Sequence, residues 1–168
     1  MTHHARVVLA DCEIALMDLR ASAETEFWRI RWVALVVLLR SVGHVLGKID
    51  THGSPEASAA ITKAWRQLQE NKPEPWIFWS SIEKERNNIL KSYKMAVHMK
   101  STVRPGTAHL GIDGSRLEPD PSGPTTFEYF FGADEYCGMN PIEACHEAIL
   151  FWREYLDLID SEAATPLL

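Results

Sequence analysis

The segment from Arg86 to Tyr93 places cationic and amide side chains in a stretch whose apolar residues recur at helical spacing. On an ideal helix, Arg86 lies about 40° and Tyr93 about 20° from Ile82, so both are expected to face the bundle or its edge. Asn87 and Lys91 are four residues apart and share a different side of this helix. An arginine at a bundle edge either pairs with a carboxylate on another helix or binds the oxyanion of a ligand.

The same segment resembles the Arg-Asn-x-x-x-His-x-Tyr motif of HEPN domains. These all-helical bundles occur in prokaryotic toxin and defence systems and in the partners of nucleotidyltransferases. Arg86, Asn87 and Tyr93 match the motif, and Lys91 stands where the family has its histidine. The resemblance implies a metal-independent ribonuclease site at the cleft of a symmetric dimer. In it Arg86 would neutralise the phosphorane charge, Asn87 would orient the phosphate and Tyr93 would donate a hydrogen bond.

Lys91 is where this chain departs from the family pattern. A histidine titrates near neutral pH, whereas a lysine must be desolvated or placed beside other cations before it can act as an acid or base. We therefore expect an RNA-binding or regulatory HEPN-like protein that has lost turnover, with a weak ribonuclease that uses a depressed lysine as the alternative. Arg40 and His44, four residues apart on an earlier helix, share one face, and His44 could supply the missing imidazole in space.

A second pattern is the Glu-x-x-His pair formed by Glu143 and His146. On a helix such a pair can bind one iron or manganese ion, as in ferritin-like bundles, but that site needs a second copy and two further glutamates. The sequence has no second copy, although Glu26, Glu83 and Glu147 could assist. A solvated helix face explains the pair more simply, so the sequence predicts no cofactor and keeps the metal-binding bundle as a lesser alternative.

Composition limits the class of protein. The chain has 168 residues, 46% of them hydrophobic, and this length and composition indicate a single globular domain over residues 1–168. Its formal net charge is −6. Because that charge repels phosphate, a nucleic-acid partner requires a local basic patch. The odd number of cysteines (Cys12, Cys137 and Cys145) fits a reducing compartment. The longest apolar run, Trp32 to Leu39, is shorter than the ~20 residues that span a bilayer, so we expect a cytoplasmic protein without a membrane partner.

Apolar periodicity predicts the elements that position these residues. Ser54 with Pro55, and Asn140 with Pro141, are start signals in which a capping residue precedes a proline at the first helical position. Trp65 and Leu68 are the expected core contacts of the third helix. The predicted helices are Ala5 to Ala21, Phe27 to Ile49 as the central one, Pro55 to before Asn71, Trp76 to about Lys100, and Pro141 to about Ile159.

Glycine and proline concentrate in the segment 102–138, which reads as an insertion. Within it, Thr125 to Phe131 is predicted to form a short strand that pairs with residues 101–104 or 108–112. Its rings must pack back on the bundle or meet a partner; they belong to Phe127, Tyr129, Phe130 and Phe131.

The predicted fold is thus all-α: a bundle of four to five helices with a hairpin-like insertion between the fourth and last helices. The expected partners are a second copy of the chain, RNA, and a protein such as an antitoxin. A non-enzymatic dimeric interaction protein that uses the aromatic insertion is the alternative function.

Overall fold

The computed structural model describes residues 2–22, 27–103, 125–132 and 138–164. They form five α-helices, one 3₁₀ turn (η1), one π-helical segment (η2) and two strands. In chain order the elements are α1 (His3–Ala21), α2 (Trp28–Lys48), η1 (Asp50–His52), α3 (Pro55–Glu70), η2 (Ile77–Glu83), α4 (Lys84–Ser92), β1 (Val97–Val103), β2 (Thr125–Phe131) and α5 (Pro141–Ala164). The protein is therefore mostly helical, as predicted, but the strand pair means that it is not purely all-α.

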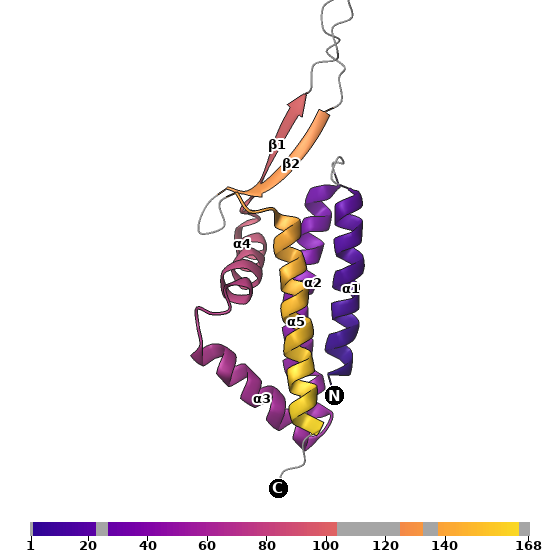
Figure 1. Ribbon diagram of the computed structural model, residues 1–168, viewed down its shortest axis with the longest axis vertical. Helices are drawn as coiled ribbons and strands as arrows, with labels where there is room; N and C mark the ends of the chain where they lie inside the picture. Colours follow the sequence, from indigo (N-terminus) through magenta and orange to yellow (C-terminus); the bar gives the residue numbers. More distant parts are fainter. Residues whose placement is uncertain (1, 23–26, 104–124, 133–137, 165–168) are drawn as a thin grey trace, which may run out of the picture.

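Three long helices form the body of the molecule (Figure 1). α1, α2 and α5 run side by side, α3 crosses near one end of this group, and the β1–β2 hairpin extends beyond the other end. α2 contacts each of the other four α-helices, which is the position expected of the central helix. Its inward face carries Trp32, Leu35, Leu39 and Val42, all almost fully buried at helical spacing.

By length and composition, the helical stretch Trp28–His52 could cross a membrane, since its best window has a mean hydropathy of 1.6. The unbroken apolar run in the sequence is shorter because arginines interrupt it. The core helix of a bundle meets the same criterion, and only 33% of that window is buried here. The property by itself therefore carries no conclusion about a membrane.

The two predicted helix starts are confirmed. Ser54 precedes α3, and its hydroxyl oxygen accepts a hydrogen bond from the amide of Ala57 at 3.1 Å. Asn140 precedes α5, and its side-chain oxygen accepts from the amide of Ile142 at 2.9 Å. In both cases the next residue is proline, whose missing N–H would have no partner within the helix. Local capping chemistry thus sets where both helices begin.

The predicted helix from Trp76 to Lys100 is wrong beyond its middle. It opens as the π-helical segment Ile77–Glu83, continues as α4 and ends at Ser92. Tyr93 follows with a left-handed φ of 52°, and its amide donates to the carbonyl of Ile89 at 2.8 Å. This conformation ends the helix, so Tyr93 does not face the bundle as its helical spacing from Ile82 predicts. Tyr93 is 59% exposed.

The residues after this turn form β1, which pairs antiparallel with β2. The register places Val97 opposite Phe131 and Val103 opposite Thr125. The predicted strand Thr125–Phe131 is confirmed, and the end of β1 coincides with the first predicted partner segment. The other predicted partner, residues 108–112, lies outside the described residues. The excursion thus leaves the helical pattern before residue 102.

One face of β2 packs back on the bundle. The Tyr129 ring stacks on Trp28 with centroids 3.8 Å apart, and Phe131 meets Trp32 edge-on at 6.0 Å. Alternate residues of a strand share a face, so this pair explains how the hairpin is anchored. On the opposite face Phe130 lies beside His98 at 6.0 Å. Packing on the bundle therefore accounts for Tyr129 and Phe131 within the aromatic cluster.

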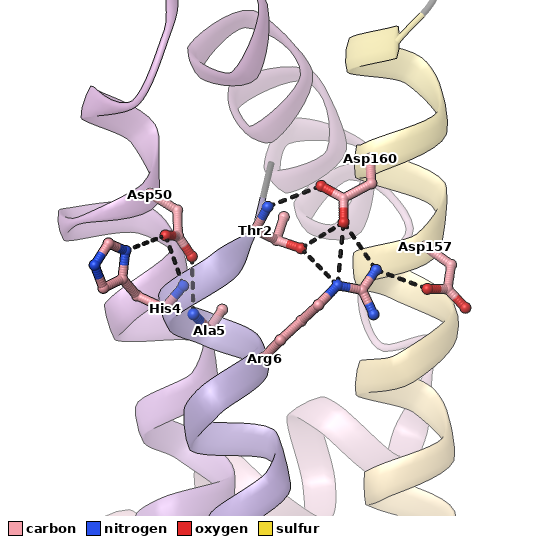
Figure 2. Close-up of polar contacts among 7 residues, drawn as sticks. All are labelled: Thr2, His4, Ala5, Arg6, Asp50, Asp157 and Asp160. Atoms are coloured by element: carbon pink, nitrogen blue, oxygen red, sulfur yellow. Dashed lines mark hydrogen bonds and ion pairs between the residues drawn. The ribbon is translucent and has the colours of Figure 1, made fainter.

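Two carboxylates hold the start of α1 (Figure 2). Asp50, which is 3% exposed, accepts hydrogen bonds from the amides of His4 at 3.0 Å and Ala5 at 2.8 Å. Asp160 of α5 accepts from the amide and hydroxyl of Thr2, both at 2.8 Å, and from the guanidinium of Arg6. Partial burial acts to raise the pKa of Asp160, but the hydrogen bonds from Arg6 and Thr2 outweigh it and hold that pKa below 3.8.

Cys12 and Cys145 are buried free thiols. Burial raises the pKa of Cys12 to about 12 and raises that of Cys145 further. The thiolate is the nucleophile, so a raised pKa makes a thiol unreactive at neutral pH. In the folded Cys137→Ser protein we therefore expect Cys12 and Cys145 to react with 5,5′-dithiobis(2-nitrobenzoate) no faster than the protein unfolds. Release of thionitrobenzoate before and after addition of urea measures this, and rapid labelling without urea would contradict it.

Candidate functional site

The four residues of the predicted site divide into two pairs along α4. Arg86 and Asn87 are half-buried, and a guanidinium nitrogen of Arg86 donates to the side-chain oxygen of Asn87 at 2.8 Å. Lys91 lies exposed in the last turn, and Tyr93 lies exposed just beyond it. Seven residues of helix span about 10 Å, so the two pairs form an extended surface and do not converge on one point.

Arg86 was expected either to form an ion pair or to face a ligand. Within residues 2–22, 27–103, 125–132 and 138–164, no carboxylate lies within ion-pair distance of its guanidinium; the described polar partner is Asn87. The cation is therefore not neutralised by this part of the chain. That arrangement favours the binding of an external anion over a structural ion pair.

Arg86 also lies close enough to α2 for its charge to act on Arg40 and His44. The pKa of His44 is lowered, first by burial and then by the positive charges of Arg40, Arg86 and Lys48. Its imidazole is therefore neutral at physiological pH. His44 of α2 thus provides an imidazole on the same side of the bundle as Arg86, although Lys91 replaces the histidine of the motif itself.

Cations collect around the exposed end of α4. Residues 84–100 contain five lysines and arginines and a single acid, Glu85, which is buried. The guanidinium carbon of Arg29, on α2, lies 5.9 Å from the centre of the Tyr93 ring, and Lys91 and Lys94 are exposed on either side of Tyr93 in the sequence. A chain of net charge −6 thus carries a local basic surface with an aromatic ring in it.

Glu85 supports this surface, although the motif does not include it. It is 4% exposed and accepts hydrogen bonds from the indole N–H of Trp32 at 3.2 Å and from the amide of Ala96 at 3.1 Å. It thereby ties α4 to α2 and to the residue just before β1, which fixes the turn that holds Tyr93. The available signal was its spacing, since Ile82, Glu85 and Ile89 share one apolar stripe.

The Glu-x-x-His pair lies on a solvated face. Glu143, His146 and Glu147 are exposed on α5. In the described part of the chain, no three histidine, cysteine, aspartate or glutamate side chains come together in a way that could hold a metal ion. Glu26, one of the proposed assisting residues, lies outside that part. The geometry of α5 therefore favours the simpler interpretation of these side chains.

The class that the geometry defines is a mostly helical bundle with a basic, aromatic surface at the junction of α4 and the hairpin. No protein-family model matches the chain, and the comparisons with curated proteins and with solved structures likewise give no match. Its function is therefore argued from these side chains.

Proposed function

We propose that this protein binds single-stranded RNA through the surface formed by α4 and the turn after it, as a HEPN-like regulatory protein of a cytoplasmic toxin or defence-type system. One observation carries the proposal: Tyr93 is 59% exposed among cations, on a chain whose net charge is −6. Proteins that bind single strands combine cations that follow the backbone with aromatic rings on which bases stack. The surface has both.

Each residue has a role in this proposal. Arg86, with Asn87 beside it, contacts a phosphate as a bidentate donor. Lys91 and Lys94 contact neighbouring phosphates as mobile point charges, and Tyr93 stacks on a base. Because the turn at Tyr93 is fixed by Glu85, the ring is held in place before RNA arrives.

Turnover is not expected. Lys91 stands at the motif's histidine position, and its side chain lies exposed to solvent and not in a desolvated pocket. The neutral imidazole of His44 is the group that would make cleavage feasible, so cleavage is the second candidate activity. A dimer of this chain and an antitoxin-like protein partner belong to the same proposal. The non-enzymatic interaction protein has less support, because Tyr129 and Phe131 of its aromatic segment pack on the bundle.

The test is binding of a short fluorescent single-stranded RNA, followed by anisotropy at several salt concentrations with EDTA present. We expect Tyr93→Ala to weaken binding about tenfold, since stacking of one base contributes ~1–3 kcal/mol, and Tyr93→Phe to bind like the wild type. Arg86→Ala should weaken binding and reduce the salt dependence by about one phosphate contact.

The matched control is Arg66→Ala, which removes an exposed charge from α3. If Tyr93→Ala and Arg86→Ala bind as tightly as this control, or if the wild type does not bind at low salt, the proposal is wrong. EDTA-resistant cleavage that disappears in Arg86→Ala and His44→Ala would replace binding without turnover by a ribonuclease. Light scattering of the same samples tests the dimer.

A further inference from the structure

A cavity of about 300 Å³ lies between α2, α3 and α5. Its walls combine glycine, aromatic and cationic side chains, and the surface at Tyr93 contributes none of them. The lining residues are Arg40, Gly43, His44, Leu46, Gly47, Thr51, Ile61, Thr62, Trp65, Trp152 and Tyr155. The volume falls at the small end of the range for ligand sites, which is enough for a fused pair of aromatic rings.

Two glycines of the central helix shape this cavity. A Cβ atom at Gly43 would lie 2.8 Å from the ring of Trp152 and 3.1 Å from a guanidinium nitrogen of Arg40, so only glycine allows those two side chains their positions. A Cβ atom at Gly47 would meet no atom within 4 Å. Glycine destabilises a helix interior relative to alanine, and at Gly47 it leaves open space where a Cβ atom would lie.

The charged group in the wall is Arg40. Its guanidinium carbon lies 5.4 Å from the centre of the Phe78 ring, and the side chain is half-buried. Among the residues that the structure describes, no carboxylate lies within ion-pair distance of it. Burial lowers the pKa of Arg40, Glu83 opposes this and Arg86 adds to it. A half-buried cation without a partner is unfavourable, and an anion in the cavity would relieve that cost.

The rest of the wall is suited to a flat apolar body. Trp152 is 1% exposed and Trp65 is 37% exposed, so one ring forms the floor and the other lies at the rim. The Tyr155 hydroxyl stays protonated, because burial raises its pKa. The other polar side chains of the lining are His44, Thr62 and Thr51, whose hydroxyl donates to the carbonyl of Leu46 at 3.2 Å. Aromatic walls with a few polar groups are typical of sites for small organic ligands.

We propose that this cavity binds a small aromatic carboxylate, with its ring system against Trp65, Trp152 and Tyr155 and its carboxylate on Arg40. A guanidinium pairs with a carboxylate through two parallel hydrogen bonds. Arg40 is the one lysine or arginine among the described residues of the lining, and His44 is neutral at physiological pH, so the wall matches a monoanion better than a doubly charged phosphate. None of the residues proposed to contact RNA lines this cavity, so the two binding proposals can fail independently.

The experiment is isothermal titration calorimetry with 2-naphthoate as the probe, at low salt and neutral pH. We expect saturable binding with one site per chain, at least tenfold weaker binding of the neutral 2-naphthamide, and at least tenfold weaker binding of 2-naphthoate to Arg40→Gln. Arg66→Gln, which removes the same charge from an exposed position on α3, should bind like the wild type. Equal affinity for the acid and the amide, or no loss in Arg40→Gln, would overturn the proposal.

A second variant separates occupancy of the cavity from damage to the fold. Gly47→Leu places a side chain in the open space and replaces a helical glycine, so its melting temperature should equal or exceed that of the wild type while 2-naphthoate binding is lost. Gly47→Ala should gain stability with only a small loss of affinity. Undiminished binding to a folded Gly47→Leu protein would show that the probe binds elsewhere. RNA binding by the Gly47→Leu protein should equal that of the wild type.

Discussion

Replacing Glu85 by alanine is expected to lower the free energy of unfolding by about 2–4 kcal/mol. The truncation leaves the indole N–H of Trp32 and the amide of Ala96 without their acceptor in a buried place. It also removes the link between α2, α4 and the turn before β1. Urea denaturation followed by circular dichroism measures the change. We expect the loss in RNA affinity to be comparable to that of Tyr93→Ala, because the same turn positions that ring.

The conservative variant Glu85→Gln is expected to separate hydrogen bonding from charge. Burial raises the pKa of Glu85 above 4.5, although hydrogen bonds from Trp32 and Ala96 and the charge of Lys84 act against the rise. A raised pKa in the folded state means that the stabilisation by this group is full below 4.5 and is lost as the pH rises through the folded-state value. Glu85→Gln should therefore gain stability relative to the wild type as the pH is raised from about 4.5 through the folded-state pKa of Glu85.

The control for this profile is Glu147→Gln, which changes an exposed carboxylate on α5. Asp160, whose pKa is lowered, gives the stability of both proteins a pH dependence of the opposite sign. The quantity to compare is therefore the difference in unfolding free energy between variant and wild type at each pH, in which this contribution cancels. A difference for Glu85→Gln that stays constant with pH would contradict the buried charge. A Glu85→Ala protein as stable as the wild type would contradict the role of its hydrogen bonds.

Asp50→Ala is the second substitution with a large expected effect, a loss of about 2–3 kcal/mol in the free energy of unfolding. Thr2 makes no side-chain capping bond to α1, and Asp50 performs that function from outside the helix by accepting from the amides of His4 and Ala5. Its negative charge also lies at the positive end of the helix dipole. Denaturant titration measures the loss, which should be smaller for Asp50→Asn because the amide keeps one acceptor.

The matched control for Asp50 is Asp157→Ala. Asp157 also lies near the start of α1 and bonds to Arg6 at 2.7 Å, but its side chain is 63% exposed. Exposed ion pairs contribute little, so we expect a change within about 0.5 kcal/mol. Equal effects of the two substitutions would show that capping by Asp50 is not what stabilises this end of α1.

The helix starts could be predicted because their causes are local. Ser54 with Pro55 and Asn140 with Pro141 carry their capping groups within three residues, and the strand Thr125–Phe131 follows from its β-branched and aromatic residues. The end of α4 could not be predicted in this way. A tyrosine in the left-handed conformation has no sequence signature, and its turn is stabilised by Glu85, whose partner on α2 lies 53 residues away.

For the candidate site, too, the sequence predicted the positions that depend on local helix geometry and not those that depend on how the helices pack. Helical periodicity correctly placed Arg86 at the edge of the bundle, where it is half-buried. It placed Tyr93 on the wrong side, because the helix does not reach that residue. The approach of Arg40 and His44 to Arg86 depends on how α2 packs beside α4, and residue spacing within one helix carries no information on that.

The contacts at the start of α1 also bear on the order of folding. Thr2 and Asp160 are 158 residues apart in the chain, so their hydrogen bonds close one of the longest loops in the molecule. During synthesis α1 and α2 can pair as soon as both have left the ribosome, and Asp50 can cap α1 at that stage. The bonds to Asp160 must wait until α5 has been made. Between these events the nascent chain exposes the side of the α1–α2 hairpin that α5 later covers. A chaperone that binds this chain would bind that side during this interval.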